Sequence, residues 1–160
     1  LGLEYDSSIF PKAMPRYGID GFDPEPRNYR LPEGGRIVEL PLSVVPWCGW
    51  DWPVAGGGFV RLLPQMMLDP MVEKLGQLGR LYILYTHPYE FDPEPIDVGS
   101  NFPDGSHFPA WKRLAMNFKW NLFRGTFRDK TRHLLKSLSL STCKEIADDI
   151  KNNQCAKLLG

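Results

Sequence analysis

The sequence feature that most constrains the fold is a short apolar segment, Leu81–Thr86, which ends abruptly at His87-Pro88. Its residues are nearly all apolar or aromatic and do not alternate with polar ones. Such a run is typical of a strand that is covered on both faces, as in the parallel sheets of α/β proteins. The segment therefore predicts an α/β fold, and a chain of 160 residues is long enough to bury such a sheet.

The remaining segments complete an α/β order of elements. We expect short strands at three places, namely residues 1–10, 36–43 and 138–141. The chain has fifteen prolines and fifteen glycines, which favours long shaped loops, here over 11–35, 46–61 and 92–106. Spacings of three and four predict a helical region at 62–78, divided at Asp69-Pro70 and ended by Gly79. They also predict a helix at 108–124, followed by a second helical stretch from Gly125 to about 136; the apolar face of the first consists of Phe108, Trp111, Leu114, Ala115, Phe118 and Leu122. A capping box of Thr142 and Glu145 predicts a last helix to about 152.

We interpret residues 1–160 as a single domain, with barrel strands and loops in 1–106 and C-terminal helices with a short strand in 107–160. Nineteen basic and nineteen acidic residues cancel, so no overall field indicates nucleic acid as a partner. No apolar run is long enough for a membrane span, and no signal-peptide pattern is present. Because the chain opens directly on strand-like sequence at Leu1, we expect further residues upstream.

Three ionisable residues are expected at the carboxyl ends of strands, where the sites of parallel α/β folds lie: Asp6, Glu39 and His87. An imidazole held before Pro88 can act as an acid or base near neutral pH, and a carboxylate beside it would orient it. Each residue also has a structural interpretation. His87 could be bonded within a loop, Asp6 could cap a turn, and Glu39 could occupy a solvated strand position.

The loop predicted at 46–61 offers candidate substrate contacts. Trp50 and Trp52 could stack on the apolar faces of sugar rings, or they could anchor the loop to the core. Gly57 and Gly58 permit close backbone approach to a ligand but lack the phosphate-loop signature, and a plain turn is the alternative. Arg61 could bind an anionic or hydroxylated group.

The stretch 107–136 contains eight Lys or Arg residues and one acidic residue, Asp129, with aromatic residues between them. A basic amphipathic helix of this kind could lie on an anionic membrane surface. In the alternative interpretation the aromatic residues face the core and the charges form a solvated face. His107 and His133 have no partner at metal-ligand spacing and are expected at the surface.

Five pieces of the chain together resemble one family. In order, they are Tyr5-Asp-Ser-Ser-Ile-Phe-Pro11, Arg16-Tyr-Gly18, Glu39-Leu-Pro-Leu-Ser43, Pro53-Val-Ala-Gly-Gly-Gly-Phe-Val-Arg-Leu62 and Leu84-Tyr-Thr-His-Pro-Tyr-Glu-Phe-Asp-Pro93. They resemble the polysaccharide deacetylases of bacterial exopolysaccharide and exosortase gene clusters, which belong to the nodulation-type carbohydrate esterase family.

The resemblance implies the C-terminal part of a distorted (β/α) barrel and the hydrolysis of acetamido groups on a bacterial exopolysaccharide. It implies a divalent metal, usually zinc, that activates the attacking water. Leu84 to His87 resembles the family's Leu-x-His motif with one extra residue, so His87 would protonate the leaving amine. Asp6 resembles the aspartate that tunes this histidine, and Glu39 is a second candidate for that place.

The family's metal-binding motifs, Thr-Phe-Asp-Asp and His-x-x-x-His, and its Arg-x-Pro motif are missing from this sequence. We therefore expect the C-terminal half of a deacetylase, inactive by itself, which pairs with a complementary N-terminal half or with a second copy. A non-catalytic glycan-binding module and a degenerate structural module are the alternatives. The compartment stays open between bacterial cytoplasm and cell envelope.

Overall fold

The computed structural model describes residues 2–15, 17–98 and 109–158, and its first sheet has three short strands. These are β1 (Tyr5–Asp6), β2 (Arg27–Arg30) and β3 (Arg36–Glu39), in the order β1-β3-β2. β1 pairs with β3 in parallel, whereas β2 and β3 form an antiparallel hairpin. The expected strands at 1–10 and 36–43 are thus confirmed in shorter form, but the loop expected over 11–35 contains β2.

The second sheet is a hairpin of β4 (Val44–Trp47) and β5 (Trp50–Pro53). Its two-residue turn, Cys48-Gly49, has positive φ at both positions, 51° and 79°, which matches the tight turns that join twisted antiparallel strands. The expectation of a loop over 46–61 is wrong, because the hairpin is followed at once by a helix.

That helix, α1 (Gly57–Leu62), and the next, α2 (Gln65–Gln77), are separated at Pro64. The boundary expected at Asp69-Pro70 is wrong, since Pro70 lies inside α2. The buried face of α2 offsets the hydrogen bond that this proline removes, and its residues are Leu68, Met71, Val72 and Leu75. Gly79 ends the helical region with a φ of +68°, as expected.

The segment Leu81–Thr86 does not form a strand of either sheet, and its residues are only half-buried. It runs beside the chain that leads into α1, where Tyr85 and Gly56 form one isolated bridge. The Ser43 hydroxyl donates to the Leu81 carbonyl (3.1 Å) and accepts from the Ile83 amide (2.7 Å), so a side chain replaces part of a strand ladder. The expected fully buried parallel strand is therefore wrong.

The C-terminal part is helical: α3 (Ala110–Asn121), α4 (Arg124–Ser137) and α5 (Cys143–Leu158). α3 and α4 are divided at Phe123, which has a φ of +56°, rather than at Gly125. The capping box is confirmed, because Thr142 and Glu145 exchange hydrogen bonds of 2.8 and 3.2 Å.

Three further expectations about this part have different outcomes. No strand forms at 138–141, and α5 extends past residue 152. Phe108 and His107 lie outside the described residues, as does most of the loop expected at 92–106. Among the described residues, every helix is too short or too polar to cross a bilayer.

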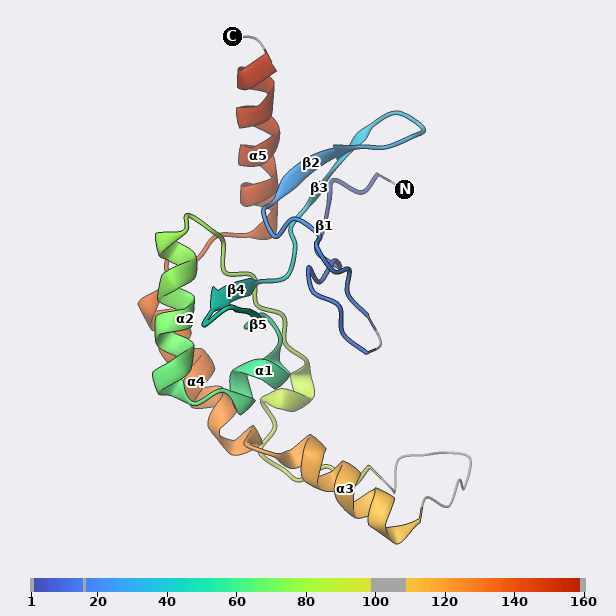
Figure 1. Cartoon of the computed structure of the whole chain (residues 1–160), viewed down its shortest axis with the longest axis vertical. Helices are drawn as coiled ribbons and strands as arrows, with labels where there is room; N and C mark the ends of the chain where they lie inside the picture. Colours follow the sequence, from blue (N-terminus) through green and yellow to red (C-terminus); the bar gives the residue numbers. More distant parts are fainter. Residues whose placement is uncertain (1, 16, 99–108, 159–160) are drawn as a thin grey trace.

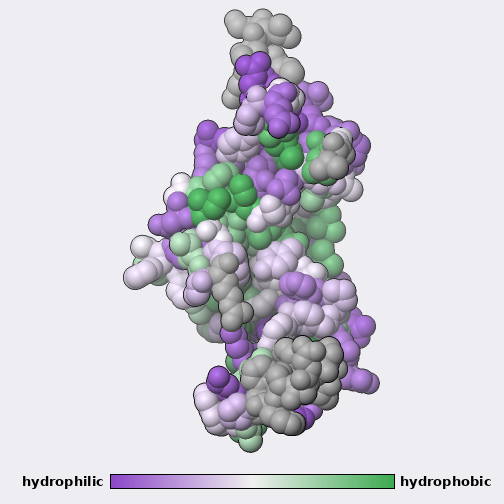
Figure 2. All heavy atoms as spheres, turned by 90° about the vertical axis from the view of Figure 1, so that its right-hand side faces the viewer, coloured by the Kyte–Doolittle hydropathy of each residue, from purple (hydrophilic) through white to green (hydrophobic). Residues whose placement is uncertain are grey.

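The main core lies between the β4–β5 hairpin and helices α1, α2 and α4, while α5 covers the first sheet (Figure 1). Hydrophobic residues also reach the surface in separate patches, with hydrophilic residues between them (Figure 2). The protein is thus a mixed α/β fold with two small sheets, and the described residues form no closed barrel.

Candidate functional site

Two of the expected site residues, Asp6 and Glu39, lie next to each other across the parallel strands β1 and β3. Asp6 accepts a hydrogen bond from the Ser8 hydroxyl (2.6 Å), and Glu39 accepts one from the Ile9 amide (3.0 Å). Glu39 is buried, and its carboxyl group is close enough to that of Asp6 for the two to affect each other electrostatically. The turn after β1 therefore holds both acids in place.

Burial raises the pKa of Glu39, and the negative charge of Asp6 adds to this effect. The Ile9 amide acts in the opposite direction but is outweighed. The pair lines a pocket of about 190 Å³ whose other walls come from Ile9, Phe22, Tyr29 and Ile37. The raised pKa makes Glu39 a candidate proton donor or acceptor at this pocket.

We expect Glu39→Gln to flatten the dependence of stability on pH. Because the pKa of Glu39 is raised on folding, its protonated form stabilises the protein fully below the ordinary pKa of glutamate, and this contribution is lost as the pH rises through the raised value. Glutamine is neutral throughout and can donate to Asp6. Urea unfolding from acidic to neutral pH measures the effect, with Glu33→Gln on the exposed β2–β3 turn as the control. An unchanged pH profile in Glu39→Gln contradicts the prediction.

His87 contacts a different set of residues. It caps the short 3₁₀ helix η1 (Pro88–Glu90), and its backbone amide donates to Glu90 Oε2 at 2.9 Å. Its Nδ1 lies 3.8 Å from the same oxygen. The Glu90 side chain is 2 % exposed, whereas that of His87 is 54 % exposed. A buried carboxyl group thus faces one ring nitrogen, and about half of the imidazole side chain remains exposed.

Gly57 makes room for this carboxylate. A Cβ at position 57 would overlap the Oε2 and Cδ atoms of Glu90. Gly56 likewise makes room for the Tyr85 side chain, because a Cβ at position 56 would lie 2.9 Å from the phenol oxygen. The Gly57 amide also donates to the Tyr85 carbonyl at 3.1 Å. The glycines thus allow close packing at the His87 site, but against the chain's own side chains.

Aromatic rings lie beside His87 in a row formed by Tyr85, Tyr89 and Trp120, called the aromatic row below. Tyr89 stacks on the imidazole with centroids 5.3 Å apart, and Tyr85 meets it edge-on at 5.8 Å. Trp120 from α3 continues the row at 5.4 Å from Tyr89. Burial raises the pKa of both Tyr85 and Tyr89, so both phenols remain neutral hydrogen-bonding groups at neutral pH.

Arg61 lies inside the protein, in α1, rather than on a loop that is open to substrate. Its guanidinium donates to the Trp120 carbonyl (2.8 Å) and the Lys119 carbonyl (3.4 Å), at the end of α3. Arg124 is also buried and donates to the Tyr89 carbonyl (2.5 Å). These two arginines fix the backbone of the aromatic row.

The other expected substrate contacts are dispersed. Trp50 is exposed on β5, while Trp52 is partly buried against the main core. Gly58 has open space where a side chain would be. The structure therefore brings Asp6 and Glu39 together, and it places His87 with Glu90 and the aromatic row.

The described residues do not fit the zinc site that the resemblance implies. They contain no group of three His, Cys, Asp or Glu side chains that could hold a metal ion. Structural and catalytic zinc sites need at least three such ligands, whereas Asp6 and Glu39 are two carboxyl groups that accept hydrogen bonds from the Ser8 hydroxyl and the Ile9 amide.

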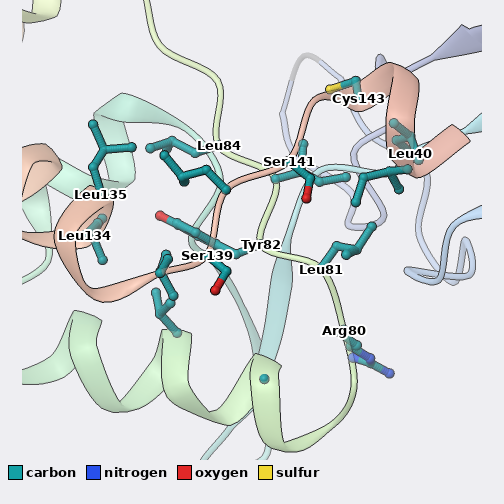
Figure 3. A pocket seen from close by; sticks show the side chains of 16 residues that line it. Leu40, Arg80, Leu81, Tyr82, Leu84, Leu134, Leu135, Ser139, Ser141 and Cys143 are labelled. Carbon is teal, nitrogen blue, oxygen red and sulfur yellow. The ribbon is translucent and has the colours of Figure 1, made fainter.

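A larger cavity, about 450 Å³, lies elsewhere, between α2, the Arg80–Leu84 segment and the chain that joins α4 to α5 (Figure 3). Aliphatic side chains line most of it, and its polar groups are few: Arg80, Tyr82, Ser139, Ser141 and Cys143. Burial raises the pKa of Tyr82, whose hydroxyl donates to the Val54 carbonyl at 3.0 Å. This cavity has apolar walls but no acid–base pair.

Sequence reasoning missed Glu90, Tyr89 and Trp120. The signal for the first two was present, since His87-Pro-Tyr-Glu90 places both within three residues of the histidine. Nothing in the sequence near Trp120 indicates that it lies beside the His87 site, because it belongs to a helix more than thirty residues away from His87 along the chain.

Comparisons with known proteins give one match. A family model described as "Domain of unknown function (DUF3473)" matches residues 7–148. This range includes Glu39, His87, Glu90 and Trp120, but not Asp6. No curated protein and no solved structure matches the chain.

Proposed function

Because this chain belongs to the DUF3473 family of domains of unknown function, we propose its activity from its own side chains: it supplies the proton donor of a polysaccharide N-deacetylase. The observation that carries the proposal is the exposed imidazole of His87 beside the buried carboxylate of Glu90. The resemblance of the motifs around His87 to those of polysaccharide deacetylases supports the same reaction.

In the proposed reaction His87 acts on the nitrogen of the acetamido group. When the tetrahedral intermediate collapses, the bond between the carbonyl carbon and the nitrogen breaks, and the nitrogen needs a proton to leave as an amine. Glu90 faces Nδ1, so Nε2 is the nitrogen that donates this proton. Glu90 Oε2 also accepts the His87 backbone amide at 2.9 Å, which holds the histidine in place at the start of η1.

Water activation is the part of the reaction that we do not assign to this chain. The metal implied by the resemblance does not fit its described donors. We propose that a complementary N-terminal segment of the barrel provides it. Asp6 and Glu39, as a proton-sharing pair at their own pocket, are proposed to serve the same substrate.

The aromatic row supports a carbohydrate substrate. The CH faces of a pyranose are apolar and stack on aromatic rings, while its hydroxyls need hydrogen-bonding groups. Tyr89 and Trp120 offer aromatic faces for stacking and hydrogen-bonding groups beside His87. We propose that they form the sugar platform, in place of the Trp50 and Trp52 contacts expected from the sequence.

The direct test measures acetate and free amine after the protein, expressed from its complete gene, is incubated with an N-acetylated exopolysaccharide or chitooligosaccharides. Stoichiometric release of both products supports the proposal. Sugar binding without any release, in the presence of added zinc, favours the non-catalytic glycan-binding module instead.

We expect Trp120→Ala to weaken oligosaccharide binding about tenfold, since covering one aromatic face contributes on the order of 1–2 kcal/mol. Isothermal titration calorimetry with chitooligosaccharides measures the change. Trp111→Ala is the matched control, because Trp111 lies on the same helix and is more exposed. If Trp50→Ala weakens binding and Trp120→Ala does not, the platform lies on β5 and the assignment is wrong.

A further inference from the structure

Helix α3 is attached to the rest of the protein through polar groups. Asn117 Oδ1 accepts from the Val98 amide at 2.9 Å, and Asn121 bonds to both the amide and the carbonyl of Ile96 at 2.7 and 2.8 Å. Arg113 pairs with Asp97. The side of α3 that meets the chain is thus polar, which is the reverse of an ordinary surface helix.

The apolar side of α3 faces outward. Trp111, Leu114 and Phe118 lie at spacings of three and four on one face and are 67, 73 and 67 % exposed. No residue of α3 is buried, so the core interpretation of these side chains is wrong. Figure 1 shows the helix at one end of the molecule, away from both sheets. A face of this kind requires a partner to remove it from water.

Charge indicates which partner. Lys112 and Lys119 are seven residues apart, so they stand on the same flank of the apolar face, and both are exposed. The Lys112 ammonium also lies 5.7 Å from the Trp111 ring centroid. An apolar face of Trp, Leu and Phe with a lysine flank is the pattern of helices that lie in the headgroup region of anionic bilayers.

We propose that α3 is an in-plane membrane helix that docks this protein on an anionic lipid surface. The apolar face enters the boundary between headgroups and acyl chains, and the two lysines contact anionic headgroups. Trp120 lies on the opposite side of the same helix and packs on Tyr89, so docking leaves the His87 site uncovered. This inference rests on α3 alone and stands independently of the proposed reaction.

The test is cosedimentation of the full chain with vesicles of phosphatidylcholine alone or with 30 % phosphatidylglycerol. We expect binding to the anionic vesicles and at least tenfold weaker binding to the neutral ones. Leu114→Gln with Phe118→Gln should reduce binding tenfold or more. Lys112→Gln with Lys119→Gln should reduce it about 25-fold, at about fivefold per lysine. Met66→Gln, at a highly exposed position of α2, is the control and should bind as the wild type does.

Quenching of tryptophan fluorescence by brominated lipids is a second measurement, and its first readout uses the wild type alone. Fluorescence of the wild type should be quenched, and Trp111→Phe should remove most of the quenching. Absence of binding to anionic vesicles overturns the proposal, as does equal binding by the Leu114/Phe118 variant. Self-association that the same variant abolishes, without vesicle binding by the wild type, assigns the face to a protein interface instead.

Discussion

His87→Ala is expected to lower the turnover of acetamide hydrolysis by a factor of about 10²–10⁴, the usual contribution of a positioned general acid. The proposed role of the imidazole is to protonate the departing nitrogen, and alanine has no proton to give. Oligosaccharide affinity should change little, because Tyr89 and Trp120 remain. The measurement is steady-state acetate release by the protein expressed from its complete gene, together with calorimetric binding.

The control for this substitution is His133→Ala. His133 is as exposed as His87, and its Nε2 lies 3.3 Å from Asp69 on a different surface. Its removal should leave turnover within a factor of two. Equal turnover of His87→Ala and the wild type would remove His87 from the mechanism. A loss of affinity in His87→Ala that accounts for the whole loss of activity would make His87 a binding residue only.

Gly57→Ala is expected to destabilise the fold by about 1–3 kcal/mol, the range for overpacking a well-filled site. The added methyl group would overlap the carboxylate of Glu90. That carboxylate cannot move outward easily, because it is 2 % exposed and accepts the His87 amide. Urea unfolding followed by circular dichroism measures the loss.

Gly58→Ala is a close control for Gly57→Ala. Both glycines begin α1, but a Cβ at position 58 meets nothing within 4 Å. Alanine there should stabilise the protein by about 0.5–1 kcal/mol, since it restricts the unfolded chain. Glu90→Ala removes the overlapping atoms, so Gly57→Ala should cost less in that background. The same cost in both backgrounds would show that the overlap with Glu90 is not the cause.

Local features of the fold were predictable, and their physical reasons lie within a few residues. Thr142 and Glu145 cap a helix because their side chains reach each other's backbone amides three residues apart. Gly79 ends a helix because glycine readily adopts positive φ. The wrong prediction of a helix boundary at Asp69-Pro70 has its cause in tertiary packing. Local preference favoured a boundary there, but burial of Leu68 and Met71 on one face kept α2 continuous.

The candidate site was predictable in part. His87 was chosen because it follows an apolar run and precedes a proline, and the structure places it at the start of η1. Asp6 and Glu39 were expected at the carboxyl ends of parallel strands, where they lie. The expectation that one of them orients His87 is wrong, because Glu90 contacts His87 and the pocket of Asp6 and Glu39 does not include it. Glu90 lies three residues from His87 in the sequence, but that its carboxylate is buried could not be predicted locally, because a glycine 33 positions earlier makes room for it.

The sequence by itself determined the capping box at Thr142, the helix stop at Gly79, the acids at the ends of β1 and β3, and that eight basic residues gather in 107–136. Only the tertiary structure decided that Leu81–Thr86 bonds to Ser43 instead of entering a sheet, and that α3 turns its apolar face outward. The difference between these two groups of features lies in how far apart in the sequence the interacting residues are. Caps and turns depend on hydrogen bonds between residues a few positions apart, whereas burial and pairing depend on which distant segments fold against each other.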